Sequence, residues 1–327
     1  MRLGAAIMVT MTASAADQSV LRPSGPQAAH IHWLWDVMLW TTGVIYVVVL
    51  LALFAGAWRR RRATDPTTMT DAKLEKYVVA SVAASTVILF GLLIASVAVG
   101  KAISDLDARD GLTINVTGYQ WWWRVEYVHP EPAQYITTAN EIHIPVGRPV
   151  AFVLTSSDVI HSFWAPNLHG KRDLIPNQKN SLVLRADKPG VYRGQCAEFC
   201  GLQHAKMAFV IIAEPQEKFD AWYTNQVKPA AEPVTEEQVK GRDVFLSHAC
   251  VMCHTIRGTQ ANARLGPDLT HIKSRATIAA GTLPNERGHL GGWISNPQSI
   301  KQGVRMPPNP LMPDELSALL GYLESLK

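Results

Sequence analysis

The stretch Gln195-Cys196-Ala197-Glu198-Phe199-Cys200-Gly201-Leu202-Gln203-His204-Ala205-Lys206-Met207 determines how the rest of the chain is interpreted. Within twelve residues it supplies two thiolates, an imidazole and a thioether. This donor set is soft and suits copper, whereas hard cations such as magnesium prefer oxygen. A structural zinc site could use the two cysteines and the histidine, but zinc has little use for a thioether. A tight chelating loop also keeps its ligands fixed when the charge of the metal changes, which a one-electron relay requires.

The spacing Cys-x-Glu-x-Cys-Gly-x-x-His-x-x-Met resembles the binuclear copper (CuA) loop of cytochrome c oxidase subunit II. In that family a further histidine ligand stands on an earlier loop, and it matches the histidine within Ser157–Phe163. The resemblance implies six copper ligands: bridging thiolates of Cys196 and Cys200, imidazoles of His161 and His204, and weak ligands from Met207 and the backbone carbonyl of Glu198. It also implies that the Glu198 carboxylate faces the neighbouring subunit and helps to hold a magnesium or manganese ion, for which oxygen ligands are suited.

Length, charge and cysteine usage limit the other possibilities. A chain of 327 residues is long for one domain and predicts two or three segments. The net charge of +4 is mild and unpatterned, so we expect no nucleic-acid partner. Two of the four cysteines lie in the copper loop and two in a second motif, which leaves none for a structural disulfide.

Residues 1–30 are expected to be a leader or signal peptide followed by an extended N terminus. Ala13-Ser14-Ala15 resembles the end of a secretory signal, with cleavage after Ala15. The apolar run Leu3–Met11 is short and contains threonine, so an uncleaved N terminus stays open.

Residues 31–104 are expected to form a hairpin of two transmembrane helices. Val37–Trp58 and Tyr77–Gly100 run for 22 and 24 residues without a charge, and about 20 residues cross a hydrocarbon core. A buried core helix is the alternative, but neither run has a polar face. The loop between them begins with Arg59-Arg60-Arg61-Arg62, and cationic short loops stay on the cytoplasmic side. We therefore expect a bacterial inner-membrane protein with both termini on the outer, periplasmic side.

Residues 105–213 are expected to form an all-β copper domain. Short alternating runs bounded by glycine, proline and asparagine predict strands at Leu112–Gly118, Trp122–Tyr127, Glu141–Pro145, Val150–Ser156, Ser181–Leu184 and Ala208–Ala213. Many short strands without a helical period favour an antiparallel sandwich or barrel. The family resemblance implies a cupredoxin-like Greek-key barrel, with copper ligands at the tips of its loops.

Three consecutive tryptophans, Trp121-Trp122-Trp123, interrupt this region. Side chains alternate along a strand, so the rings must lie on both faces. The resemblance assigns Trp121 to an exposed position over the copper site, where electrons enter. Asp158 and Asp173 match acidic family positions that face a donor or the catalytic subunit, although isolated surface carboxylates are usually only solvated.

A linker at 214–234 contains three prolines and is expected to begin as a short helix at Glu217–Gln226. Thr235-Glu236-Glu237-Gln238 is typical of a helix start, and Val239–His248 continues that helix. Residues 235–327 are then expected to form a separate helical domain that ends with a helix at Pro313–Leu326.

Cys250-Val251-Met252-Cys253-His254 is the attachment pattern of c-type haem. Cys250 and Cys253 would form thioethers to the porphyrin, and His254 would be the proximal iron ligand. A zinc half-site is the alternative, but it would need a second Cys or His pair at ligand spacing, which His271 and His289 do not provide.

The distal ligand is predicted from Val304-Arg305-Met306-Pro307-Pro308, which resembles the ligand loop of class I cytochromes c. Met306 is the expected iron ligand, and Met312 is its rival. The resemblance implies that the carbonyl of Pro267 orients His254 from outside the ligand sphere and that Trp293 packs near the haem edge.

Together these segments resemble subunit II of a cytochrome c oxidase with a fused C-terminal cytochrome c (the caa type). The expected cofactors are binuclear copper, one covalent haem c and magnesium or manganese at the subunit interface. The subunit would pass electrons from haem c to copper and on to subunit I, which reduces oxygen, in a complex that includes subunit III. The donor would be a quinol–cytochrome c reductase or a soluble cytochrome c.

Two alternatives stay open. The same relay could serve a nitric oxide reductase of that superfamily, or the chain could be a membrane-anchored copper and haem redox protein without an oxidase partner. A quinol oxidase subunit is disfavoured, because that branch lacks the copper ligands present here.

Overall fold

The computed structural model describes residues 18–62, 71–106, 108 and 111–327. The chain divides into two compact units, one of residues 27–106 and one that holds the rest of the described chain. The expected leader at 1–16 and its cleavage site after Ala15 lie outside the described residues.

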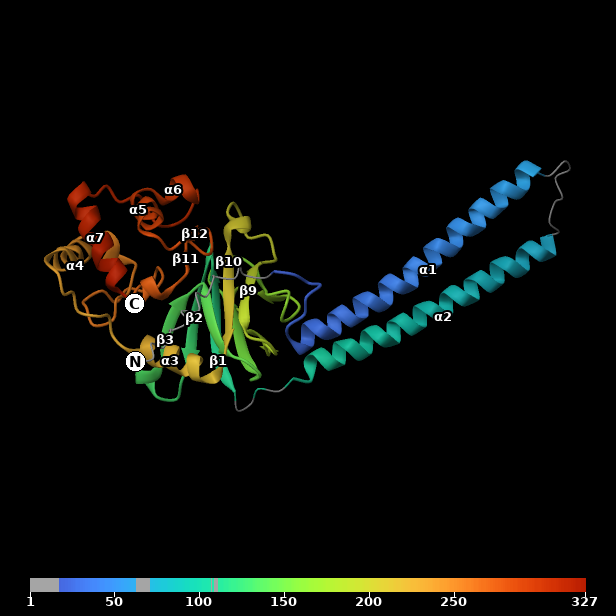
Figure 1. Cartoon of the computed structure of the whole chain (residues 1–327), viewed down its shortest axis with the longest axis horizontal. Coiled ribbons are helices and arrows are strands. Elements are labelled where there is room, and N and C mark those ends of the chain that lie inside the picture. Colours follow the sequence, from blue (N-terminus) through green and yellow to red (C-terminus); the bar gives the residue numbers. More distant parts are fainter. Residues whose placement is uncertain (1–17, 63–70, 107, 109–110) are drawn as a thin grey trace, which may run out of the picture. The chain divides into compact units, whose positions relative to one another are not determined.

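The first unit consists of two long helices, α1 (Pro26–Arg62) and α2 (Asp71–Ser104) (Figure 1). Both are long and apolar enough to cross a membrane, and none of the most apolar window of either helix is buried. Large apolar side chains such as Phe54, Val87 and Ile94 are therefore exposed along the helices. A protein in water rarely exposes apolar area of this extent, so a lipid environment accounts for it.

The second unit begins with a two-layered β structure, which we call the β module (residues 111–227). One sheet has the strand order β3-β2-β1-β5-β8 and the other has β4-β10-β9-β6-β7. The strands are β1 (Leu112–Tyr119), β2 (Trp122–Val128), β3 (Ile136–Ala139), β4 (Glu141–Pro145), β5 (Val150–Ser156), β6 (His161–Trp164), β7 (Arg172–Leu174), β8 (Asn180–Leu184), β9 (Gly190–Cys196) and β10 (Ala208–Glu214).

The β module is a cupredoxin-like sandwich, as the sequence predicted. The pairing is mainly antiparallel, as expected, except that β1 pairs with β5 and β4 pairs with β10 in parallel. Parallel neighbours need a long crossover connection, and the chain between each pair supplies one by passing through other strands of the module.

Aromatic rings fill the space between the two sheets. Trp123 is fully buried and packs edge-on against Phe163 and Phe209. The preceding ring, Trp122, lies on the other face of β2 and stacks on Tyr119. The predicted alternation of the tryptophan rings is therefore confirmed, and the buried ring supports the strands that lead to the copper loop.

Helix α3 (Gln216–Val227) closes the β module, and a short proline-containing segment leads to a second module. This helical module (residues 235–327) contains α4 (Glu236–Ser247), α5 (Arg287–Ser295), α6 (Pro297–Ile300), α7 (Pro313–Ser325) and the short strands β11 (Thr277–Ile278) and β12 (Leu283–Pro284). The described part of the chain also contains the 3-10 turns η1 (Pro132–Gln134), η2 (His204–Lys206), η3 (Ala249–Met252) and η4 (Ile272–Ser274).

The helix start predicted at Thr235 is present as a capping box. The Thr235 hydroxyl accepts a hydrogen bond from the backbone N–H of Gln238, and the side-chain Oε1 of Gln238 accepts the backbone N–H of Thr235. The core of the helical module includes Phe245 on α4, Leu290 on α5, and Leu319 and Leu323 on α7.

Helices α4 and α7 approach closely at Gly241. A Cβ atom placed there would lie 2.0 Å from the backbone oxygen of Ala318. No rotamer change can relieve a clash between a Cβ and backbone, so the two helices require glycine at this crossing.

Gly241→Ala is therefore expected to destabilise the helical module by about 2 kcal/mol, as overpacking typically does. Gly288→Ala is the matched control, since a Cβ there meets nothing within 4 Å. Native-state hydrogen exchange of the α4 and α7 amides measures the change in local unfolding free energy. Equal exchange in the two variants would contradict the helix-crossing argument.

Candidate metal and haem sites

The structure brings the side chains of the copper loop and His161 together at one end of the β module. Cys196 Sγ lies 3.7 Å from Cys200 Sγ and 3.8 Å from His161 Nδ1. Cys200 Sγ in turn lies 3.6 Å from His204 Nδ1 and 3.8 Å from Met207 Sδ. The backbone oxygen of Glu198 is 3.1 Å from Cys196 Sγ. All six predicted donor positions thus surround one small volume.

Strand pairing positions these groups. Phe163 on β6 pairs with Cys196 at the end of β9, and the backbone N–H of Cys196 donates to the carbonyl of Met207. The ring of His161 lies against Gly118, where a Cβ atom would be only 2.8 Å from the imidazole. Adjacent strands and a required glycine therefore hold the ligand loop and His161 in fixed register.

The two buried thiols influence each other's protonation. The hydrogen bond with Cys200 lowers the pKa of Cys196, and the same bond raises the pKa of Cys200, with burial acting in the same direction on Cys200. A thiolate is the form that binds metal, so a cation that binds between the sulfurs would displace the remaining thiol proton. The donor set and its electrostatics fit a soft metal.

Asp158 orients the imidazole of His161. Its carboxylate Oδ1 lies 2.9 Å from His161 Nε2, and Oδ2 accepts the backbone N–H of Gln120 at 2.8 Å. Burial lowers the pKa of His161, but the bonds to Asp158 and Cys196 outweigh it and the pKa is raised overall. A hydrogen at Nε2 leaves the Nδ1 lone pair directed at the sulfurs, as in the carboxylate–histidine–metal arrangement. The sequence comparison suggested only a surface role for Asp158, so this contact was missed.

Trp121 lies directly over the loop. Its indole Nε1 donates to the carbonyl oxygen of Cys200 at 3.0 Å, and the Gln120 amide donates to the same oxygen at 2.8 Å. The expectation that Trp121 is exposed was wrong, because only 8% of the residue is accessible. The helical module covers the ring: a Cβ atom at Gly303 would be 3.5 Å from it.

The Glu198 carboxylate is half-exposed and lies 3.7 Å from the ammonium of Lys171. An exposed carboxylate can take part in a cation site that other groups complete.

The helical module holds the predicted haem-binding residues. Cys250 lies within η3, Cys253 follows its last residue, and His254 comes directly after. The ring Nδ1 of His254 donates to the carbonyl oxygen of Pro267 at 2.8 Å, which leaves Nε2 as the possible iron ligand. Burial lowers the pKa of His254, which favours the neutral imidazole that a metal requires.

Two further features of this module fit a flat prosthetic group beside His254. Gly266 lies against the imidazole, and a Cβ atom there would be 2.7 Å from its Cε1. Trp293 on α5 and Met306 both pack against the module core. These residues, with the two cysteines, match the donors and the apolar wall that haem c needs.

The rival methionine occupies a different environment. Met312 is 63% exposed and caps α7, where its backbone N–H donates to Glu315. The Met306 loop is instead tied inward, because the Gln298 amide donates to the carbonyls of Val304 and Met306. The structure therefore favours Met306 as the axial ligand.

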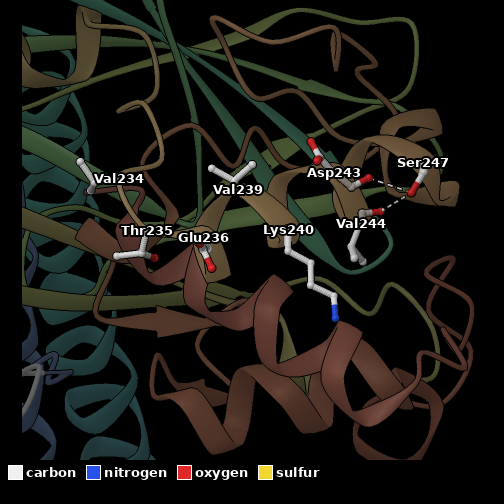
Figure 2. A pocket seen from close by; sticks show the side chains of 8 residues that line it. All are labelled: Val234, Thr235, Glu236, Val239, Lys240, Asp243, Val244 and Ser247. Carbon is white, nitrogen blue, oxygen red and sulfur yellow. Dashed lines mark hydrogen bonds between the residues drawn. The ribbon is translucent and has the colours of Figure 1, made fainter.

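A surface hollow along α4 lies apart from these residues. Figure 2 shows its lining, with the Ser247 hydroxyl donating to the carbonyls of Asp243 and Val244. The lining residues are Val234, Thr235, Glu236, Val239, Lys240, Asp243, Val244 and Ser247, and they include none of the predicted ligands.

Comparisons with known families agree with this division of the chain. Residues 128–214 match the family described as cytochrome c oxidase subunit II, periplasmic domain. Residues 238–327 match the cytochrome c family.

Curated relatives carry the description cytochrome c oxidase subunit 2. Cytochrome c oxidase subunit 2 of Alkalihalophilus pseudofirmus is 37% identical to this chain, over 94% of this chain and 91% of the relative. The protein of that name from Bacillus sp. strain PS3 is 33% identical, over 69% of this chain and 66% of the relative. Among solved structures, the periplasmic domain of subunit II of cytochrome oxidase of Bradyrhizobium japonicum is 31% identical, covering 37% of this chain and 95% of that one, with a TM-score of 0.34.

Asp158→Asn is expected to weaken metal binding about 10- to 100-fold, the usual effect of losing a carboxylate that orients a ligating histidine. The neutral amide cannot hold His161 in the required tautomer with the same strength. Competition with a copper chelator measures the affinity, and Asp173→Asn on β7 is the control. Equal affinity in the two variants would show that the Asp158 contact does not support the site.

Proposed function

Because the chain belongs to the cytochrome c oxidase subunit II family, we propose that it accepts electrons at a covalent haem c and passes them through binuclear copper to oxidase subunit I. Each of these groups, when bound, cycles by one electron, and oxygen chemistry takes place in subunit I. The chain itself is a membrane-anchored subunit of an oxidoreductase complex. Its own residues hold, orient and connect the two redox groups.

The copper residues are proposed to act as one rigid ligand set. Cys196 and Cys200 would hold the copper ions through their thiolates, and His161 and His204 would each supply an imidazole ligand, because the two imidazoles approach different sulfurs of the pair. Met207 and the Glu198 carbonyl complete the set as weak ligands. The Glu198 carboxylate is proposed to share a magnesium or manganese ion with subunit I.

The haem residues are proposed to act in the same manner. Cys250 and Cys253 would attach the porphyrin, and His254 and Met306 would supply the iron ligands. The Pro267 carbonyl fixes the His254 ring, and Trp293 contributes to the apolar wall. Histidine and methionine ligation raises the reduction potential of haem, which suits an electron donor.

One observation supports the proposed relay: hydrogen bonds join Trp121 both to the copper loop and to the loop that contains Met306. Its indole donates to the carbonyl of the copper ligand Cys200, and its own carbonyl accepts a bond from Lys301 at 2.8 Å. Lys301 stands five residues before Met306 in the same loop. A second link joins Arg305 to Asp158, whose carboxylate also bonds to His161, although Arg305 is largely exposed and the ion pair of 3.7 Å is long. Trp121 is thus proposed as the residue through which electrons enter the copper site.

The membrane arrangement is proposed from the helices and their flanks. The lipid bilayer surrounds α1 and α2, and the arginines at the end of α1 lie on the cytoplasmic side. Both soluble modules then lie on the periplasmic side. Subunit I is the proposed partner in the membrane, with subunit III in the same complex, and a quinol–cytochrome c reductase or a soluble cytochrome c delivers electrons.

Metal analysis of a Cys200→Ser variant tests the copper assignment. The purified complex is expected to lose its near-infrared binuclear copper absorption, because a serine oxygen cannot bridge two soft ions. The haem c spectrum should stay unchanged, and oxygen uptake should fall at least 100-fold. An unchanged copper band, or zinc in place of copper in the wild type, would refute the proposal.

The axial assignment is tested by Met306→Ala, with Met312→Ala as the matched control. Met306→Ala is expected to abolish the weak iron–sulfur charge-transfer band near the red end of the spectrum. Met312→Ala should leave that band intact, since its side chain is exposed at the start of α7. The opposite result would make Met312 the ligand.

A further inference from the structure

Lys301 is a buried cation at the contact between the β module and the helical module. It follows α6 and is only 1% exposed. Lysine is almost never fully buried unless its ammonium is paired. The burial of its ammonium therefore requires hydrogen-bond acceptors and cannot be explained by packing alone.

Three backbone carbonyls surround the ammonium. Lys301 Nζ donates to the carbonyl oxygens of Trp121 at 2.8 Å, Lys206 at 2.7 Å and Ala279 at 3.1 Å. Three acceptors match the three N–H groups of the charged form. Burial lowers the pKa of Lys301 to about 7, so these bonds offset a real desolvation cost.

Two of the three acceptors belong to the β module, and both border the copper loop. The Trp121 carbonyl belongs to the residue whose indole bonds to Cys200, and Lys206 precedes the ligand Met207. Lys301 thus completes its hydrogen bonds only when the two modules are in contact in this register. In another docked orientation, a buried Lys301 ammonium would lack the Trp121 and Lys206 carbonyls as acceptors, which is costly.

Neighbouring contacts continue the same interface. The Gln203 amide donates to the carbonyl of Gln302 at 2.8 Å, and the Lys206 ammonium donates to that of Ile300 at 2.6 Å. Val304 packs against the core of the β module. The segment 300–304, just before Met306, therefore covers Trp121.

The β module also contributes a buried ionisable side chain to this interface, Glu141. Glu141 on β4 is 4% exposed, and its Oε1 accepts the backbone N–H groups of Ala276 at 2.7 Å and Thr277 at 3.2 Å. Each module therefore satisfies backbone groups of the other with one buried charged side chain. This reciprocal arrangement selects one docked orientation.

The segment that joins the modules is also held. The Arg257 guanidinium donates to the carbonyl of Val227, and a ring nitrogen of His271 lies 3.0 Å from the carbonyl of Lys228. Pro229 and Pro233 stiffen the same segment. These bonds limit the distance over which the helical module can move.

We propose that Lys301 is a positioning residue that locks the helical module over Trp121, so that this module is a fixed donor and not one that swings on its linker. The inference rests on the proposed relay for its function, whereas the docking is argued from hydrogen bonds between protein groups alone. A soluble donor cannot reach the covered Trp121 ring and must deliver its electron to the helical module.

Hydrogen exchange of the intact complex tests the docking. Lys301→Met keeps the length of the side chain but removes the charge and all three bonds. We expect amide exchange in segments 203–208 and 300–304 to rise at least tenfold, while α4 and α7 keep their protection. Lys240→Met is the matched control, because the Lys240 ammonium pairs with Asp314 inside the helical module.

Glu141→Gln provides a second variant from the other module, and exchange at 276–277 is expected to rise while 203–208 changes less. Unchanged exchange in Lys301→Met, or rapid exchange of 300–304 already in the wild type, would overturn the proposal. These readouts do not depend on electron transfer, so they separate failure of the docking from failure of the proposed function.

A kinetic readout distinguishes positioning from general destabilisation. After photoreduction of the haem, copper reduction in the wild type is expected to be independent of solvent viscosity. In Lys301→Met it should be at least tenfold slower and should slow further as glycerol is added, because the module must now search for its docked position. Intact haem and copper spectra in that variant show that both sites are assembled. A viscosity-dependent rate in the wild type, or an unchanged rate in Lys301→Met, would contradict a fixed donor.

Discussion

Two thiols held 3.7 Å apart at one end of the β module are the constraint on which the rest of the structure depends. Two thiolates so close in an apolar setting repel each other strongly, and a shared proton or a cation must lie between them. The strands beneath prevent the loop from relaxing, since Cys196 is fixed by pairing with Phe163 and by its bond to Met207. The sandwich therefore holds the proposed ligands of a soft cation in fixed positions. The helical module packs over this ligand loop.

Much of this architecture could be predicted because the decisive signals are local in sequence. Five of the six proposed copper ligands lie within twelve residues, and the proposed haem attachment motif spans five. Strands such as Glu141–Pro145 and Val150–Ser156 were predicted with the bounds that the structure has, because each is a clear alternating run. Strands β3, β6, β7 and β9 were missed. They are short or contain glycine and charged residues, and tertiary pairing rather than propensity stabilises them.

The remaining features depend on contacts between residues far apart in the chain. Trp121 and Lys301 are separated by 180 positions, and nothing near either residue in the sequence indicates the other. A lysine in a loop is ordinarily solvated, so its burial follows only from the docking of two modules. The prediction that Trp121 is exposed was wrong for the same reason, because the docked helical module covers the ring. The contact of Asp158 with His161 spans three residues but depends on the turn before β6, which periodicity does not reveal.

When the electron donor and the electron acceptor are domains of one chain, the interface between them has different requirements from that of a soluble donor. A soluble donor must leave after each electron, so its interface is small and is guided by charges at the rim that act mainly on the association rate. A tethered donor never has to leave, since the linker keeps its effective concentration high. Buried side chains such as Lys301 and Glu141 complete their hydrogen bonds in only one docked orientation. They do not slow the reaction cycle, because a tethered donor does not have to dissociate. They contribute a reproducible distance between the two redox groups, and for electron transfer that distance matters more than affinity.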